Sequence, residues 1–292
     1  MRSLEIVRIR GETREILHDR ITEEISLRVL AGHRRLVELV CSPADLEDLV
    51  RGFFFTNGLI HSSDHIQRVV VNRSGWSAFV ELAPEIDPDT FRLRRVIGSA
   101  CASAFRLEEE AREEEGEGSG TVNGSAAAEG GHHRDRQKRC AAEAVPGALS
   151  GSAAGLTVSS GQIGALMEQL RERSEVHRQT GGVHAAGLAD RKRILVFRED
   201  IGRHNAVDKV IGAFLKQGGD FRDKLLLSSG RLSSEILQKA EACALPIVVS
   251  RSAPTDRCVA LARKRDITLI GFARGRRLNI YSAEQRVRVG DV

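Results

Sequence analysis

Five clusters of polar residues and glycine in the second half of the chain have the composition of a binding site for an anion. They are residues 180–188 (TGGVHAAGL), 199–209 (EDIGRHNAVDK), 228–235 (SSGRLSSE), 250–255 (SRSAPT) and 271–277 (GFARGRR). Glycine allows a ligand to approach the backbone closely, and free N–H groups at helix starts attract anions. Arginine adds forked donors that suit phosphate, here Arg203, Arg231, Arg251, Arg274, Arg276 and Arg277. The pattern favours a phosphate-bearing ligand, although any single glycine is equally well explained as a turn. His184 and His204 are better explained as hydrogen-bonded structural residues than as residues that take part in chemistry.

Cys101 is the best candidate for a nucleophile. It lies in a run of small residues, 98–104 (GSACASA), and four arginines flank it: Arg92, Arg94, Arg95 and Arg106. Small neighbours expose a thiol, and nearby cations favour the thiolate, which is the form that accepts or donates sulfur. The alternative is a loop cysteine without a role.

The other cysteines, Cys41, Cys140, Cys243 and Cys258, give no metal or disulfide pattern. The total is odd and no pair has CxxC spacing, so we expect neither a disulfide framework nor a structural zinc site. Cys243 and Cys258 fall within apolar helical patterns, which predicts that both are buried.

Composition places these residues in a globular protein. The chain has 292 residues, of which 41% are hydrophobic and 29% charged, values typical of folded domains. No apolar run is long enough for a membrane helix, and charges interrupt the N-terminal segment, so we expect a cytoplasmic protein without a signal peptide or a membrane partner. The net charge is +4, and residues 251–292 hold ten Lys or Arg against four Asp or Glu, which suits a small polyanion.

Residues 1–105 predict a smaller, strand-rich domain of α+β type that ends in the Cys101 loop. Apolar alternation predicts hairpins over residues 25–40 and 66–82. Between them, Ser42 and Pro43 are typical of a helix start, and Gly58 of its end. Residues 106–157 predict a disordered linker, because seven glutamates fill 108–117 and 22 of the 40 residues in 116–155 are Gly, Ala or Ser. Whether the acidic run docks a basic partner is left open.

Residues 158–292 predict an α/β domain. We expect a helix that begins at Ser159 or Ser160, a short helix over 181–188, and then alternating strands and helices. The predicted strands are 194–197, 225–227, 247–249, 268–270 and 278–281, and the predicted helices 205–216, 233–244 and 255–264. Short apolar strands between helices indicate a sheet covered on both faces, with a ligand crevice at the strand ends.

Three longer segments accompany or extend the clusters: SPADLEDLVRGFFFTNGLI at 42–60, EDIGRHNAVDKVIG at 199–212 and GFARGRRLNIYS at 271–282. With the clusters, they make the chain similar to the FdhD/NarQ family of formate dehydrogenase accessory sulfurtransferases. The resemblance covers nearly everything except the predicted linker. It implies a sulfur carrier that takes sulfur from a cysteine desulfurase as a persulfide. The carrier passes it to the molybdenum or tungsten bis-guanine-dinucleotide cofactor before that cofactor enters formate dehydrogenase.

The resemblance also implies site residues, a fold and an assembly. Cys101 matches the family's sulfur-carrying cysteine. The guanine-dinucleotide segment corresponds to Phe272, Ala273, Arg274, Gly275, Arg276 and Arg277, and Gly182, His184, Arg203, His204 and Arg231 line the same crevice. The second domain resembles the three-layer α/β/α cytidine deaminase fold, and the family is homodimeric.

This chain departs from the family pattern at one position. The family motif has a second cysteine three residues after the first, and here that position is Ala104. A resolving thiol is therefore absent locally, with Cys140 as a distant substitute. The alternative function is a chaperone that binds the cofactor without moving sulfur.

Two further activities are disfavoured by the residues present. A zinc deaminase needs His-x-Glu and Pro-Cys-x-x-Cys, whereas Ala185 and Ala186 follow His184 and no cysteine occurs in 231–234. Nucleic-acid binding is disfavoured because the sequence has no stripe of interleaved basic and aromatic residues, and it contains one Trp and one Tyr.

Overall fold

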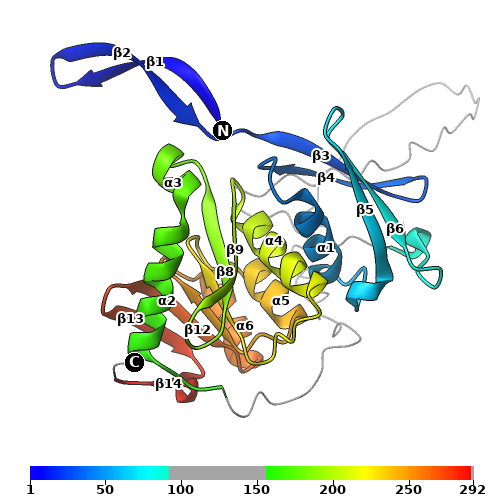
Figure 1. The fold of residues 1–292 in the computed structure, drawn as a ribbon. Coiled ribbons are helices and arrows are strands. Elements are labelled where there is room, and N and C mark those ends of the chain that lie inside the picture. Colours follow the sequence, from blue (N-terminus) through cyan, green and yellow to red (C-terminus); the bar gives the residue numbers. More distant parts are fainter. Residues whose placement is uncertain (92–155, 291–292) are drawn as a thin grey trace, which may run out of the picture.

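A computed structural model describes residues 1–91 and 156–290 (Figure 1). Cys101, Ala104, Cys140 and the predicted linker up to residue 155 lie outside the described residues. Leu156, at the end of the predicted linker, is buried against the sheet of the second half.

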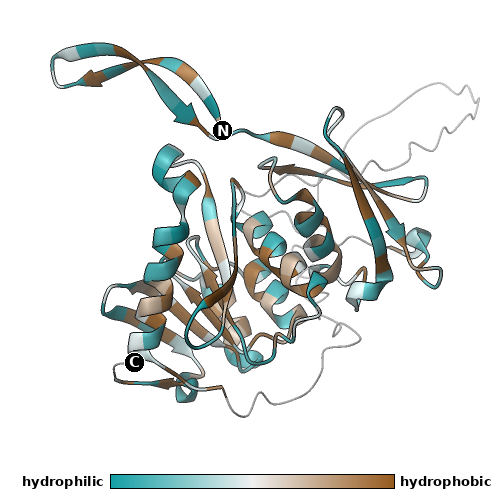
Figure 2. Ribbon diagram, viewed as in Figure 1, coloured by the Kyte–Doolittle hydropathy of each residue, from teal (hydrophilic) through white to brown (hydrophobic). Residues whose placement is uncertain are grey.

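The chain begins with an isolated antiparallel hairpin, β1 (Arg2–Arg10) and β2 (Thr13–Ile21). It projects away from the rest of the molecule, with apolar residues on both strands (Figures 1 and 2). Its base is tied to helix α3 (Glu175–Thr180), because Arg20 donates to Gln179 at 2.8 Å and Thr22 to Thr180 at 2.9 Å.

A four-stranded sheet of order β4-β3-β6-β5 follows. Its strands are β3 (Ile25–Ala31), β4 (Arg34–Cys41), β5 (Ile66–Asn72) and β6 (Ser77–Leu82). The two predicted hairpins are thus confirmed, with β3 and β6 joined in parallel. Alternate residues of β3 are fully buried, as expected of a strand with one face on a core.

Helix α1 (Leu46–Thr56) connects the hairpins, and its predicted start is wrong. It begins at Leu46 rather than at Pro43. Ser42 is held outside the helix by the second half of the chain: its N–H donates to Asp200 at 3.0 Å and its hydroxyl accepts from the Ile201 N–H at 3.1 Å. These tertiary hydrogen bonds outweigh the local capping preference.

The second half contains a six-stranded sheet of order β13-β12-β11-β10-β8-β9. Its strands are β8 (His184–Ala189), β9 (Ile194–Asp200), β10 (Leu225–Ser228), β11 (Ile247–Ser250), β12 (Thr268–Arg274) and β13 (Arg277–Ser282). Strands β10, β11 and β12 are parallel, and the other pairs are antiparallel. A short parallel pair, β7 (Val158–Ser159) and β14 (Val287–Arg288), lies outside this sheet.

Helices cover both faces of the six-stranded sheet. Helix α2 (Ser160–Arg173) packs on one face, against Leu225, Leu227 and Val249. The other face, with Leu226 and Val248, packs against a cluster that includes residues of α4 (Arg203–Lys216), α5 (Ser234–Ala242) and α6 (Asp256–Lys264). The predicted mixed α/β class and the sheet covered on both faces are confirmed. The likeness to the cytidine deaminase fold stays a prediction.

Residues 181–188 are a strand and a loop, so the predicted helix there is wrong. Gly181 ends α3 at φ +65°, and β8 then runs between β9 and β10 with five of its six residues buried. A short run of Gly, Ala and one Leu fits a buried strand as well as a helix, and periodicity cannot separate the two over so few residues.

The two halves of the chain share one hydrophobic cluster, centred on the crossing of α1 and α4 (Figure 1). The helices approach so closely that a Cβ on Gly52 would lie 1.8 Å from the Asp208 carbonyl oxygen. A Cβ on Gly212 would lie 1.9 Å from the Asp48 carbonyl oxygen. Only glycine fits at both positions, so this contact fixes how the first half sits on the second.

Within the described ranges, none of the helices is long and apolar enough to span a bilayer.

Candidate functional site

The five clusters meet at one edge of the six-stranded sheet. Parallel strands β10 and β11 end there at Ser228 and Ser250, and antiparallel β8 begins there at His184. Backbone hydrogen bonds link the loops: Ser229 N–H to Ala185 O at 2.9 Å, Arg251 N–H to Ser228 O at 3.2 Å, and Phe272 N–H to Ser252 O at 3.1 Å. The sheet topology therefore brings together segments that the sequence spreads from residue 180 to residue 277.

At one end of this edge, the β9–α4 connection places Arg203 and His204 in the first turn of α4. His204 is buried, and its Nε2 lies 3.0 Å from the Glu235 carboxylate and 3.2 Å from the Ser233 hydroxyl. The hydrogen bond from His204 lowers the pKa of Glu235 against an opposing effect of burial. His204 is thus tied to the start of α5, where Ser233 also caps the helix.

Arg203 is buried beside Gly230 and His184. A Cβ on Gly230 would lie 2.9 Å from Arg203 Cβ and 3.4 Å from His184 Nδ1. His184 Nδ1 lies 3.4 Å from the Ser229 hydroxyl. Burial, and secondarily the positive charge of Arg203, lower the pKa of His184, so the ring is neutral at pH 7.

The residues 272–277 form the hairpin that joins β12 to β13. Phe272 has φ +53° within an irregular stretch of the ladder, and Gly275 has φ +57° in the turn. Arg276 is exposed, while Arg274 Nε donates to the Arg251 carbonyl at 2.9 Å and the Arg277 guanidinium lies 5.6 Å from the Phe272 ring centroid. Ala273 differs from its neighbours, because its side chain is buried in the core under α2.

Gly182 and Arg231 are both exposed residues of the clusters. Gly182 has a steric reason to be glycine, since a Cβ there would lie 2.5 Å from the Thr22 hydroxyl oxygen. Arg231 follows Gly230 directly, and Gly230 contacts Arg203 and His184.

Two buried ion pairs join β9, α4 and α5 next to this edge, and sequence reasoning did not predict either. Lys209 Nζ lies 2.6 Å from Asp200 with both side chains fully buried, and Lys239 Nζ lies 2.8 Å from Asp208. Asp200 also accepts from the N–H groups of Ser42 and Gly202. The pairs join residues on different elements, so no local spacing could reveal them.

Three cysteines are buried, and their thiols are not ionised at neutral pH. Cys41, Cys243 and Cys258 have exposed fractions of 0%, 5% and 0%. Burial raises the pKa of Cys41 and of Cys258 to about 12 and raises that of Cys243 as well. The predicted burial of Cys243 and Cys258 is confirmed, and none of the three forms a thiolate at neutral pH.

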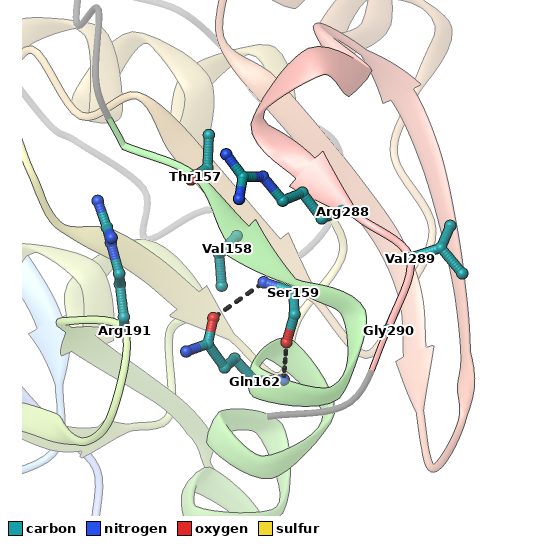
Figure 3. Close-up of a pocket in the computed structure, with 8 residues that line it drawn as sticks. All are labelled: Thr157, Val158, Ser159, Gln162, Arg191, Arg288, Val289 and Gly290. Atoms are coloured by element: carbon teal, nitrogen blue, oxygen red, sulfur yellow. Dashed lines mark hydrogen bonds between the residues drawn. The ribbon is translucent and has the colours of Figure 1, made fainter.

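No group of three or more His, Cys, Asp or Glu side chains is placed to hold a metal ion among residues 1–91 and 156–290. A hollow of about 340 Å³ opens elsewhere, where β7 and β14 meet the start of α2 (Figure 3). There the Ser159 N–H donates to Gln162 Oε1 at 2.9 Å, and the Gln162 N–H donates to Ser159 Oγ at 3.0 Å. Arg191 and Arg288 also line the hollow. None of its lining residues belongs to the five clusters.

The comparisons with known proteins agree with one another. The model of the FdhD/NarQ family matches residues 22–288. The chain is 35% identical to the sulfur carrier protein FdhD of Bacillus pumilus, over 92% of this chain and 90% of that protein. It is 34% identical to the protein of the same name from Bacillus subtilis, over 95% and 94% of the two chains.

A solved structure has the same fold. It belongs to a protein from Desulfotalea psychrophila whose description is a formate dehydrogenase accessory protein, with a TM-score of 0.70 over 98% of both chains. At 22% identity this likeness concerns the fold alone.

Proposed function

The chain belongs to the FdhD/NarQ family, and from that membership we propose that it is a sulfur carrier. It accepts sulfur from a cysteine desulfurase as a persulfide on Cys101. It passes the sulfur to the molybdenum or tungsten bis-guanine-dinucleotide cofactor that is destined for formate dehydrogenase. The observation that carries the proposal is the alignment, over nine-tenths of the chain, with relatives named sulfur carrier protein FdhD.

The loading step is a thiol exchange. The Cys101 thiolate attacks the outer sulfur of the desulfurase persulfide, the S–S bond of that persulfide breaks, and the desulfurase cysteine leaves as a thiolate. No net oxidation occurs. Release of the carried sulfur as sulfide then returns Cys101 to a thiolate and consumes two electrons, which a thiol reductant supplies.

The inertness of the other described cysteines supports this assignment. Because Cys41, Cys243 and Cys258 are buried with raised pKa values, thiolate chemistry falls to Cys101 and Cys140 of the five cysteines in the sequence. The four arginines that flank Cys101 in the sequence are expected to favour its thiolate.

We propose that the cofactor, as the substrate of the carrier, binds at the edge of the six-stranded sheet where the five clusters meet. We assign the pyrophosphates to Arg274, Arg276 and Arg277, and the guanine to Phe272. Cysteine desulfurase, formate dehydrogenase and a second copy of the chain are the proposed partners, in the cytoplasm.

The test is sulfur transfer from a cysteine desulfurase with labelled cysteine. Wild type should gain one sulfur atom by intact mass spectrometry, Cys101→Ala should gain none, and Cys140→Ala should behave as wild type. Labelling of Cys101→Ala at the wild-type level would refute the assignment of the carried sulfur to Cys101.

A cofactor chaperone is the second candidate, and Ala104 favours it because no resolving cysteine follows Cys101. Complementation of a strain that cannot mature formate dehydrogenase separates the two. Restored activity with Cys101→Ala indicates a chaperone, and lost activity with intact nucleotide binding indicates a sulfur carrier.

A further inference from the structure

Arg203 is a buried arginine whose guanidinium meets no acceptor among the described residues. It is 5% exposed, and its Nε is buried with no hydrogen-bond partner. Across residues 1–91 and 156–290 no hydrogen bond or ion pair reaches its guanidinium. Arginine is rarely buried unless it is paired, because loss of hydration must be balanced by an anion or by hydrogen bonds.

The acidic groups near Arg203 already have partners. Glu235 is close enough for Arg203 to contribute to its lowered pKa, but its carboxylate is paired with His204 at 3.0 Å. Asp200 is paired with Lys209 at 2.6 Å. Neither carboxylate meets the guanidinium, so Arg203 is left with unused donors.

Two other features lie next to the Arg203 side chain. Arg203 and His184 both pack against Gly230, since a Cβ there would lie 2.9 Å from Arg203 Cβ, 3.1 Å from Arg203 Cδ and 3.4 Å from His184 Nδ1. Arg203 is also the first residue of the 14-residue helix α4, whose N-cap is Gly202 and offers no side-chain acceptor to the first amides. The helix dipole and free N–H groups there attract an anion.

We propose that Arg203, His184 and the first turn of α4 form a subsite for one oxyanion of the phosphoryl class, separate from the Arg274–Arg277 hairpin. Strands β8 and β12 are three positions apart in the sheet, roughly 14 Å at about 4.8 Å per strand. A ligand that fills both places therefore carries phosphoryl groups at well-separated points. The link to a nucleotide cofactor rests on the proposed function; the oxyanion subsite itself does not.

The test is calorimetric titration of the full-length protein with inorganic phosphate and with guanosine diphosphate. Arg203→Leu should weaken phosphate binding by about 10- to 100-fold, the loss expected for charged hydrogen bonds. Arg222→Gln, which removes an exposed arginine paired with Asp220, should bind as wild type. Tighter binding of the nucleotide than of phosphate, in competition with it, assigns the subsite to a nucleotide, and equal affinity assigns it to a free oxyanion.

Thermal unfolding distinguishes a ligand-binding role from a structural one. In phosphate-free buffer Arg203→Leu should melt at a higher temperature than wild type, because an unpaired buried charge is removed. Added phosphate should then raise the melting temperature of wild type but not of the variant. Unchanged phosphate affinity in Arg203→Leu, or an equal rise in melting temperature with phosphate in wild type and variant, would overturn the subsite.

A milder variant keeps the test decisive if Arg203→Leu does not fold. Arg203→Lys retains the charge but loses the planar fork, and it should still weaken phosphate binding by about tenfold. Wild-type affinity in Arg203→Lys contradicts the proposal. Sulfur loading of Cys101 is a separate measurement, so a failure of the sulfur-carrier function leaves this result interpretable.

Discussion

At the scale of single residues, cysteine burial separates the thiols that can react from those that cannot. Cys41 lies in β4, Cys243 follows α5 and Cys258 lies in α6, and all three face the hydrophobic cluster shared by both halves of the chain. A buried thiol of raised pKa is neither ionised at neutral pH nor readily accessible to a reagent.

Brief alkylation of the native protein with iodoacetamide near pH 8 should therefore spare Cys41, Cys243 and Cys258. Cys101 should be modified. Peptide mass spectrometry gives the extent at each site, and the same reaction in urea, where all five cysteines should react, is the control. Rapid modification of Cys258 in the native state would contradict the burial described here.

His184 gives the pH dependence of stability at this scale. Its pKa is below the ordinary value of 6.5 because burial and Arg203 disfavour the charged ring. Near pH 6.5 and below, His184 therefore binds a proton more readily in the unfolded chain than in the folded chain. The free energy of unfolding falls as the pH drops below that value.

Replacement of His184 by Gln should remove part of this dependence. Between about pH 7.5 and pH 5.5, the free energy of unfolding from urea titrations should fall less for His184→Gln than for wild type. His33→Gln, at an exposed turn residue, should follow wild type. An identical pH dependence in His184→Gln and wild type would show that His184 does not contribute.

At the scale of elements, the crossing of α1 and α4 depends on two glycines. Their backbones touch the facing helix, and a methyl group at either position would overlap a carbonyl oxygen. Both helices are long and largely buried, so they cannot separate without opening the shared core.

Gly52→Ala and Gly212→Ala should each lower the free energy of unfolding by about 1–3 kcal/mol or more, the range for overpacked cores. Urea denaturation measures the change. Gly75→Ala is the matched control, since the nearest atom to its added methyl is at 3.5 Å. Wild-type stability in Gly212→Ala would mean that the helices do not approach as closely as described.

At the scale of the whole molecule, stability is distributed unevenly. One hydrophobic cluster contains residues of both halves, whereas the β1–β2 hairpin exposes Leu4, Val7, Ile9 and Ile16. Figure 2 shows apolar segments on both strands of this hairpin. An isolated two-stranded hairpin is only marginally stable.

Hydrogen exchange should reflect this difference. Amides of β1 and β2 should exchange much faster than those of β10 and β11, while α1 and α4 should lose protection together at higher urea. Mass spectrometry of peptic fragments resolves these segments. Core-like protection of the hairpin at high protein concentration, lost on dilution, would instead show that a second copy covers it.

The amino-acid sequence by itself determined the family, the two hairpins, the α/β alternation and the clusters that line the candidate site, because these depend on local composition and short spacings. Only the tertiary structure decided that His184 lies on a strand, that α1 begins after Ser42, and that Asp200 and Lys209 are paired. It also decided that Arg203 is buried with no partner for its guanidinium among the described residues. Those outcomes depend on which segments become neighbours in space. Packing and hydrogen bonds between distant residues outweigh local preferences when both cannot be satisfied.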